Sequence, residues 1–290
     1  MQKDAINLYL RQPPGKVNLQ RQRWLLRLMQ YWPFQNLGVL EISRQLPYWG
    51  RLPLVDHRNQ RILFYSPKAG CSTAIQWFLR GAGLLEEALA YDPWVHRYVA
   101  EVYPHEYSIY KELPKALLNH DFVKIKVVRN PYQRFASSFY HAFRHREHFF
   151  PGGLPKGFNM QDFLDVLENL HKPWLNPHFS LQYALWEDMV PGLLDEVLHL
   201  ESMDEEIRKM NQKYGWDDPL DRKVTVLRHA APRENMKEGN LHLWPYEDFL
   251  KKFPKDYSLF YTDANFRRRV YNFYQRDFEA YGYSADALKS

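Results

Sequence analysis

Residues 62–79 read ILFYSPKAGCSTAIQWFL, and they join two different apolar patterns through a short polar loop. The first part is a run of apolar, β-branched and aromatic residues that ends at Pro67, which is typical of a buried strand. The second part repeats Ala74, Trp77 and Phe78 at helical spacing and is followed by glycines. The sequence therefore predicts a strand and a helix joined by the loop PKAGC.

The segment at residues 67–73, called the anion loop below, contains groups that can bind a tetrahedral anion. A helix N-terminus offers unpaired backbone N–H groups and the positive end of the helix dipole. Gly70 permits close approach of the backbone, and the hydroxyl groups of Ser72 and Thr73 add donors. Lys68 adds a mobile positive charge, and an exposed lysine beside a turn is the alternative interpretation. Because the lysine precedes the glycine, this is not a Walker loop, which requires G-x-x-x-x-G-K-[ST].

A second strand, turn and helix follow at residues 122–145, which read FVKIKVVRNPYQRFASSFYHAFRH. The β-branched run predicts a strand, and Pro131 suits the first position of a helix. Two such units with a crossover between them predict an α/β protein with a parallel sheet flanked by helices. Ligands of such sheets bind at the carboxyl ends of the strands, so both loops should lie on one edge.

The second loop also contains groups suited to a phosphate. Arg129 ends the strand and Ser137 follows eight residues later, so both side chains could face one phosphate across the first turns of the helix. The planar guanidinium suits a phosphate dianion, and the serine hydroxyl is an added donor. Arg134 between them is either a third anion ligand or a structural ion-pair partner. Two anion sites on one sheet edge predict a ligand that is phosphorylated at two places.

The size and composition fit one folded domain. The 290 residues include 45% hydrophobic and 16% aromatic residues, which can form a sizeable core. We predict a single domain over residues 1–290, with an amphipathic N-terminal extension over about residues 1–50 and a mainly helical second half. The formal charge of +5 favours an anionic ligand, and the scattered basic residues argue against a nucleic-acid partner.

The sequence has no run of about 18 apolar residues and no signal-peptide pattern, which predicts no membrane span and no secretory signal. Cys71 is the only cysteine, which excludes an internal disulfide and a cysteine-based metal cage. These features predict a cytoplasmic protein. Residues 19–32 have a basic amphipathic pattern, which predicts a surface helix packed on the core or, alternatively, a peripheral contact with a membrane.

The two loops and three later segments resemble the sulfotransferases that use 3′-phosphoadenosine 5′-phosphosulfate (PAPS). The likeness is to the Golgi-type carbohydrate sulfotransferases, which include the chondroitin and HNK-1 enzymes, and to their bacterial relatives. The family's 5′-phosphosulfate loop resembles PKAGCST, and its R-x-P-x-x-R-x-x-S element for the 3′-phosphate resembles RNPYQRFASSF. Its H-W-x-P-Q segment, its E-x-[LM]-x-x-D stretch and its closing helix have counterparts in NPHFSLQ, DEVLHLESMDEE and VYNFYQRDFEAYGYS. The resemblance extends over about residues 61–284.

This resemblance implies a P-loop-like fold and direct transfer of the sulfuryl group from PAPS to an acceptor hydroxyl, without a metal. Lys68 would stabilise the leaving phosphate, and Arg129 with Ser137 would hold the 3′-phosphate of the donor. The 5′-phosphosulfate would be bound by Pro67, Lys68, Ala69, Gly70, Cys71, Ser72 and Thr73. The expected acceptor is a hydroxyl of a glycan or a glycolipid.

His178, within NPHFSLQ, is the predicted general base, because histidine titrates near neutral pH and can accept the acceptor's proton. A packed position between aromatic neighbours is the alternative for His178, and the base would then be sought among His96, His105, His120 and the carboxylates. Two other functions stay open, namely a small-molecule kinase and a non-catalytic module that binds glycans or polyanions. Binding of ATP with Mg²⁺ would indicate the kinase, and salt-sensitive polyanion binding without a nucleotide effect would indicate the module.

Overall fold

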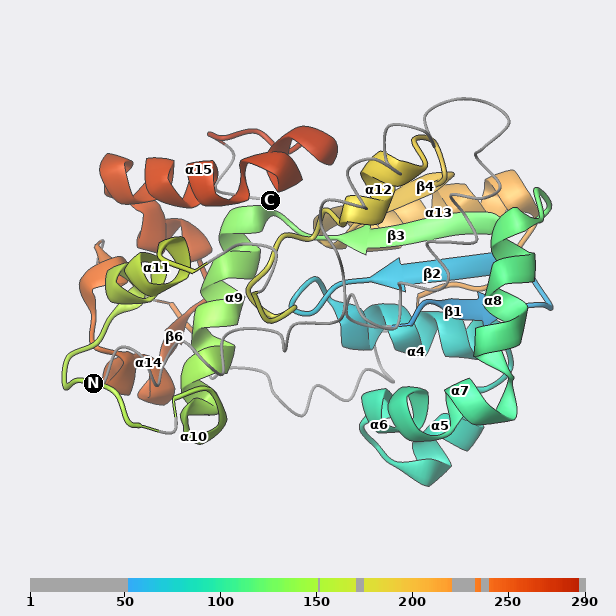
Figure 1. The fold of residues 1–290 in the computed structure, drawn as a ribbon, viewed down its shortest axis with the longest axis horizontal. Helices are drawn as coiled ribbons and strands as arrows, with labels where there is room; N and C mark the ends of the chain where they lie inside the picture. The colour runs from blue at the N-terminus through green and yellow to red at the C-terminus, as the bar shows by residue number, and fades with distance from the viewer. Residues whose placement is uncertain (1–51, 151, 171–174, 221–232, 236–239, 287–290) are drawn as a thin grey trace. The chain divides into compact units, whose positions relative to one another are not determined.

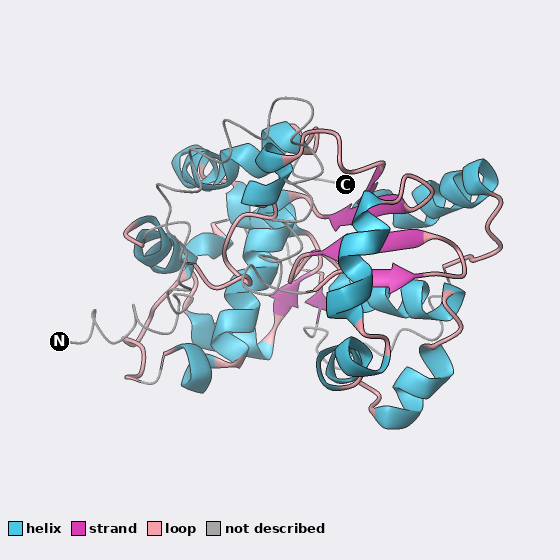
Figure 2. Ribbon diagram, turned by 45° about the vertical axis from the view of Figure 1, so that its right-hand side comes forward, coloured by secondary structure: helices cyan, strands magenta, loops and turns pink. Residues whose placement is uncertain are grey.

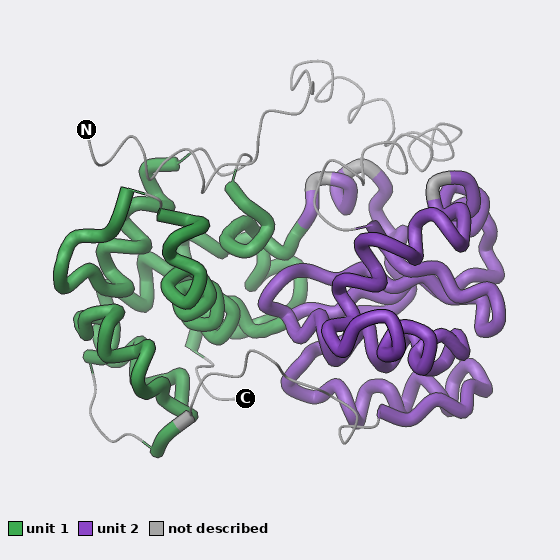
Figure 3. Tube along the Cα trace, turned by 90° about the horizontal axis from the view of Figure 1, so that it is seen from below, with its two compact units in different colours: residues 1–15, 129–183, 229–290 green, residues 16–128, 184–228 purple. Residues whose placement is uncertain are grey.

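The structure is a computed structural model that describes residues 52–150, 152–170, 175–220, 233–235 and 240–286. The predicted N-terminal extension and its helix at residues 19–32 lie outside the described residues. The chain divides into two compact units, which Figure 3 shows in two colours. Of the described residues, the sheet unit comprises 52–128 and 184–220, and the helical unit comprises 129–183 and 233–286. The single domain proposed from the sequence stays a prediction.

The sheet unit is built on four strands in the order β1-β2-β3-β4 (Figure 1). These strands are β1 (Leu54–Asp56), β2 (Arg61–Tyr65), β3 (Val123–Val128) and β4 (Glu196–His199). β2, β3 and β4 run parallel to one another, and β1 is antiparallel to β2. The two strands predicted from the sequence are confirmed, and so is their parallel pairing. The segments that follow β2, β3 and β4 therefore all leave from one edge of the sheet.

The helices of the sheet unit surround these strands. They are α4 (Cys71–Gly81), α5 (Leu85–Tyr91), α6 (Val95–Glu101), α7 (Tyr103–Glu106), α8 (Ile109–Leu118), α12 (Leu185–Met189), α13 (Met203–Tyr214) and the 3₁₀ helix η3 (Leu200–Ser202). α4 packs on β1 and β2, α8 on β1, and α13 on β4, and Figure 2 shows helices beside the strands. The sheet unit is thus mixed α/β, with a mostly parallel sheet flanked by helices, as predicted.

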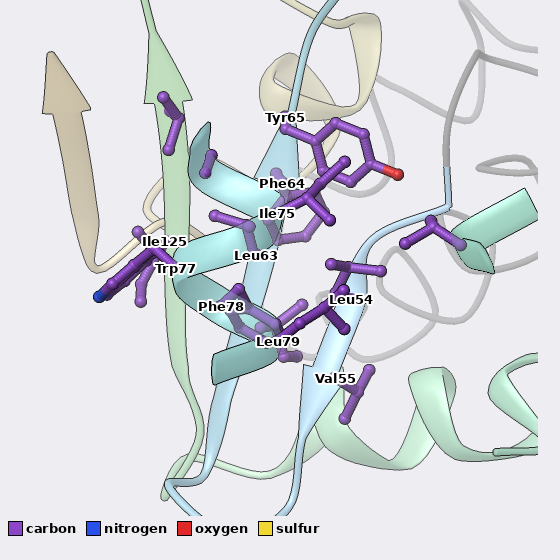
Figure 4. Close-up of a cluster of buried hydrophobic side chains, with 14 of the residues drawn as sticks. Leu54, Val55, Leu63, Phe64, Tyr65, Ile75, Trp77, Phe78, Leu79 and Ile125 are labelled. Carbon is purple, nitrogen blue, oxygen red and sulfur yellow. The ribbon is translucent and has the colours of Figure 1, made fainter. Parts of the chain in front are cut away.

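The core of the sheet unit lies between β2 and α4. All five residues of β2 are buried, which explains why this strand is apolar on both faces rather than alternating. Leu63 from β2 packs in the same cluster as Ile75 and Phe78 from α4, and all three are fully buried (Figure 4). This packing fixes where β2 ends and α4 begins, and so places the anion loop between them.

A buried arginine anchors the start of β2. The Arg61 Nε lies 2.9 Å from Asp56 Oδ2, and its Nη2 lies 2.7 Å from Asp218 Oδ2. A buried charge is tolerated because it is paired and hydrogen-bonded, and the guanidinium also lies 4.7 Å from the centre of the Trp77 ring. Gly81 at the end of α4 leaves room for this group, because a Cβ there would lie 1.8 Å from Arg61 Nη2.

The helical unit consists mainly of helices that follow β3 in the chain. Its elements are α9 (Pro131–Arg144), α10 (Arg146–Phe149), α11 (Met160–Glu168), β5 (Arg233–Glu234), η5 (Leu241–Leu243), α14 (Tyr246–Lys251), β6 (Phe253–Pro254), η6 (Tyr257–Tyr261) and α15 (Ala264–Ala280). β5 and β6 form a short parallel pair. The helix predicted after β3 is confirmed, with Pro131 at its first position.

The core of the helical unit is rich in aromatic side chains. Phe135 and Phe139 of α9 and Phe163 of α11 are fully buried, and their rings lie close to one another. One set of apolar residues along α15 and just after it is buried, namely Val270, Phe273, Tyr274, Phe278 and Tyr281. Among the described residues, no helix is both long enough and apolar enough to cross a membrane.

Candidate functional site

The anion loop meets the start of α4 in a conformation suited to an anion. Lys68 (φ 66°) and Gly70 (φ 78°) both have left-handed backbones, which is uncommon for lysine. The N–H of Ala69 donates to the carbonyl oxygen of Ser66 at 3.3 Å and closes the turn. No side chain in the described part of the chain caps α4. An anion can therefore take the place that a capping side chain occupies in other helices.

Gly70 is required at its position for two reasons. Its left-handed φ favours glycine, because other residues lose free energy in this conformation. In addition, a Cβ at this position would lie 2.3 Å from Leu200 Cδ1 and 2.9 Å from Leu200 Cδ2. Leu200 lies in η3, directly after β4, so the backbone of the anion loop packs against the segment that follows the neighbouring strand.

The residues of the anion loop differ in exposure. Pro67 and Ala69 are buried, so their side chains pack the loop against the protein. The others are partly exposed, namely Lys68, Gly70, Cys71, Ser72 and Thr73. The lysine and both hydroxyl residues are therefore partly accessible to solvent. Binding of a phosphosulfate by these residues stays a prediction.

A histidine from α6 contacts the anion loop. His96 is 5% exposed, and its Nε2 lies 2.9 Å from Ser72 Oγ. The same nitrogen lies 3.6 Å from Cys71 Sγ. From the sequence, His96 is only one alternative base, and no local pattern predicts this contact because the two residues are 24 positions apart. The contact places a titratable side chain against the proposed donor-binding residues.

The segment after β4 also lies against the anion loop, through Leu200. The N–H of His199 donates to Glu206 Oε2 at 2.6 Å, and His199 Nδ1 lies 3.1 Å from Glu206 Oε1. Ser202 Oγ donates to Glu206 Oε1 at 2.7 Å. Burial raises the pKa of the Glu206 carboxyl, but the hydrogen bonds from His199 and Ser202 outweigh it, so the pKa falls. The ionised Glu206 thus holds the turn that presses Leu200 against Gly70.

Arg129 in the helical unit is held by its backbone and by its side chain. Its N–H donates to Gln182 Oε1 at 2.8 Å, and Gln182 Nε2 donates to the Arg129 carbonyl oxygen at 2.8 Å. The guanidinium carbon lies 5.2 Å from the centre of the Tyr257 ring, and Nη2 lies 3.5 Å from Gln133 Oε1. The guanidinium is therefore pre-positioned, which lowers the entropy that a phosphate ligand would have to overcome.

The start of α9 differs from the start of α4 because a side chain caps it. Asn130 Oδ1 accepts from the N–H of Tyr132 at 3.0 Å and of Gln133 at 3.5 Å. A phosphate at this end would therefore be bound through side chains rather than through the helix N-terminus. Ser137 is partly exposed, whereas the neighbouring Ser138 is buried and donates to the His178 carbonyl oxygen at 2.7 Å. The joint action of Arg129 and Ser137 on one phosphate stays a prediction.

Arg134 has a structural role in the helical unit. Its side chain is buried, and Nη1 donates to the Ser180 carbonyl oxygen at 2.6 Å. Nη2 donates to the Pro177 carbonyl oxygen at 3.0 Å. Burial lowers the pKa of the guanidinium. The sequence allowed Arg134 to be an anion ligand or a structural partner. The structural role fits, and the partners are backbone carbonyl groups.

His178 lies in the loop that Arg134 supports. Asn176 Oδ1 accepts from the His178 backbone N–H at 3.0 Å, and the same oxygen lies 2.8 Å from His178 Nδ1. Because an oxygen faces Nδ1, this nitrogen bears the proton in the neutral ring, and Nε2 is the acceptor nitrogen. The ring is partly exposed and stacks on His141, with centroids 4.5 Å apart. With Nε2 as the acceptor nitrogen, the His178 ring can take up the proton of an acceptor hydroxyl. The role of His178 as the catalytic base stays a prediction.

One comparison with known proteins supports the sulfotransferase family noted in the sequence. A model of the sulfotransferase family matches residues 53–284, which includes the anion loop, Arg129 and His178. The chain therefore belongs to the sulfotransferase family. No curated protein and no solved structure matched the chain. Within the ranges that the structure describes, no group of three or more His, Cys, Asp and Glu residues is arranged to hold a metal ion.

Proposed function

We propose that the protein transfers the sulfuryl group of PAPS to a hydroxyl of a carbohydrate or a glycolipid. The observation that supports this most strongly is the geometry of the anion loop in a member of the sulfotransferase family. Lys68 and two hydroxyl residues lie next to a left-handed glycine in the chain, at the start of α4, which no described side chain caps. These groups can bind a terminal phosphosulfate by charge and by hydrogen bonds, in a P-loop-like manner.

The proposed reaction is a direct in-line displacement at sulfur. The acceptor oxygen forms a bond to sulfur while the bond from sulfur to the bridging oxygen breaks, and the electron pair moves to the leaving phosphate. Adenosine 3′,5′-bisphosphate leaves. Lys68 stabilises the negative charge that develops on this phosphate, and the backbone and hydroxyl groups of the anion loop keep it in place. Direct transfer forms no covalent intermediate, so Cys71 lines the loop and does not act as a nucleophile.

The 3′-phosphate of the donor is assigned to Arg129 and Ser137. A guanidinium forms paired hydrogen bonds to a phosphate, and the contacts with Gln133 and Tyr257 restrain the side chain of Arg129. These two residues would make the protein prefer PAPS over an analogue that lacks the 3′-phosphate. His178 is the base that the sequence predicts, and His96 is a second candidate because it contacts the anion loop.

The experiment that tests this function measures transfer of radiolabelled sulfate from PAPS to a panel of glycans and glycolipids. We expect transfer to at least one acceptor by the full chain, and loss of transfer by Lys68→Ala. In parallel, a thermal-shift assay compares adenosine 3′,5′-bisphosphate with ATP and Mg²⁺. We expect the bisphosphate to raise the melting temperature and ATP with Mg²⁺ to leave it unchanged. Stabilisation only by ATP with Mg²⁺, without any sulfate transfer, would contradict the proposal and indicate a kinase.

A further inference from the structure

An exposed aromatic surface lies beside the histidine that contacts the anion loop. Three large apolar side chains are exposed among the described residues, and two of them, Tyr91 (47%) and Trp94 (40%), lie just before α6. The ring of Trp94 lies next to that of His96, with centroids 5.4 Å apart. Exposed tryptophan is uncommon on a surface without a partner and is enriched where proteins bind other molecules. This surface, formed by Tyr91 and Trp94, is called the aromatic surface.

A network of polar contacts holds the aromatic surface in one arrangement. Asp92 Oδ1 accepts from the Trp94 backbone N–H at 2.7 Å, and Asp92 Oδ2 pairs with Arg97 at 3.3 Å. Arg97 also donates to Glu101 at 3.1 Å, and the Tyr91 hydroxyl donates to Glu101 at 2.6 Å. Single exposed ion pairs contribute little to stability, but a connected set of them restricts the motion of the segment that contains Trp94. These contacts restrain the backbone of Trp94 and the side chain of Tyr91, which lowers the entropy that binding of a ligand would cost.

Ser72 connects His96 to the proposed site of the donor. A serine hydroxyl has one proton and can donate it to one strong acceptor at a time. Without a donor molecule, the Ser72 hydroxyl can donate to His96 Nε2 across the observed 2.9 Å. When a phosphate oxygen of PAPS accepts from Ser72 instead, Nε2 no longer receives this hydrogen bond and can accept a proton from another hydroxyl. Binding of the donor would therefore activate His96 as a base.

We infer that Trp94 and His96 form the acceptor subsite, in which a sugar ring stacks on Trp94 and one of its hydroxyl groups gives its proton to His96 Nε2. This inference rests on the proposed function and specifies its acceptor as a sugar with an apolar ring face. The proton moves to Nε2 as the new oxygen–sulfur bond forms, and the old sulfur–oxygen bond breaks with its electron pair on the leaving phosphate beside Lys68. His96 belongs to the same unit as Lys68 and contacts the same loop.

The first experiment tests His96 in the full chain, with radiolabelled PAPS as donor and a pool of p-nitrophenyl glycosides as acceptors. His96→Gln keeps a hydrogen-bonding side chain but removes the base, so turnover should fall by about 10²–10⁴-fold. The dissociation constant for adenosine 3′,5′-bisphosphate should change by less than about threefold, which a general structural defect would not allow. His57→Gln is the matched control, because His57 is exposed beyond the other end of β2, and it should keep wild-type turnover.

His178→Gln is measured beside these variants. Wild-type turnover in His96→Gln overturns the inference, and a simultaneous loss in His178→Gln would assign the base to His178. A wild-type protein that neither binds adenosine 3′,5′-bisphosphate nor transfers sulfate overturns the proposed function as well. A wild-type protein that binds the bisphosphate but transfers sulfate to no glycoside overturns the sugar subsite and leaves the donor site intact.

The second experiment tests the stacking role of Trp94. Trp94→Ala should raise the KM for the glycosides by about tenfold or more, because the stacking contact with the sugar ring is lost, and Trp94→Phe should retain most of the affinity. Transfer to glycerol, which has hydroxyl groups but no ring, should be the same in all three proteins. Leu243→Ala removes the third exposed apolar side chain and serves as the control. Equal KM values for the glycosides in the wild type and Trp94→Ala overturn the subsite.

Discussion

Gly70→Ala tests whether the anion loop has the backbone geometry described here. A left-handed φ of 78° costs an alanine roughly 1–2 kcal/mol. The new Cβ would also lie 2.3 Å from Leu200 Cδ1, and overpacking of this kind costs roughly 1–3 kcal/mol. Alanine lowers the entropy of the unfolded chain, which offsets roughly 0.4–1 kcal/mol of this loss. We therefore expect the free energy of unfolding to fall by roughly 1–5 kcal/mol.

Gly192→Ala is a matched control in the same unit. Gly192 also has a φ of 78°, but no atom lies within 4 Å of the position of its Cβ. At Gly192 only the cost of the left-handed backbone applies. The free energies of unfolding of the two variants, measured by urea denaturation, should therefore differ by roughly 1–3 kcal/mol. Isothermal titration with adenosine 3′,5′-bisphosphate should show weaker binding for Gly70→Ala and unchanged binding for Gly192→Ala, because only the first substitution displaces the anion loop.

Leu200→Ala completes a double-mutant cycle, because it removes the clash but not the backbone cost. The coupling between Gly70→Ala and Leu200→Ala should be favourable by roughly 1–3 kcal/mol, which is the overpacking that the double variant avoids. Additive losses in the cycle would refute the contact between Leu200 and the anion loop. Equal losses in the two glycine variants would refute it independently.

Three further changes concern the anion loop and the two cores. Lys68→Ala should lower the turnover of sulfate transfer by about 10²–10³-fold without changing the melting temperature, and near-normal turnover would contradict its role. Gly81→Ala should lower the free energy of unfolding in urea by roughly 3–5 kcal/mol, because its Cβ would displace Arg61 from Asp218, and a loss below about 1 kcal/mol would contradict this. Burial lowers the pKa of His242 below 6.5, so the folded state binds fewer protons than the unfolded state and stability falls as the pH drops through this value. His242→Phe should therefore reduce the fall in melting temperature between about pH 7 and 5, and parallel curves for the two proteins would argue against it.

The elements of the fold that the sequence predicted are the ones with long or continuous apolar patterns. β2 reads as an apolar run because it is buried in a parallel sheet, β3 is rich in β-branched residues, and α15 repeats its buried positions over 17 residues. The connection at residues 84–121 gave no clear pattern. It folds into four short helices, α5 to α8, of which the longest has ten residues and contains a proline. Helices this short depend on tertiary packing more than on their own sequence.

The sequence predicted only those parts of the candidate site whose residues are close together in the chain. The spacing of glycine, lysine and hydroxyl residues identified the anion loop, because a loop between strand and helix is a local structure. The contact of His96 with Ser72 joins segments that are distant in the chain, and no local pattern indicates it. Similarly, the spacing left Arg134 open between an anion ligand and a structural partner, and the structure shows that it binds the carbonyl groups of the loop at residues 177–180.

The affinity for adenosine 3′,5′-bisphosphate, compared with that for adenosine 5′-phosphate, tests the proposed donor most directly. Isothermal titration of the wild type should show at least about tenfold tighter binding of the bisphosphate, because charge-assisted hydrogen bonds to a phosphate contribute on the order of 1.5–3 kcal/mol. Arg129→Ala should bind the two nucleotides with nearly equal affinity, since it lacks the guanidinium assigned to the 3′-phosphate. Equal affinity of the wild-type protein for both nucleotides would contradict the assignment of PAPS as the sulfuryl donor.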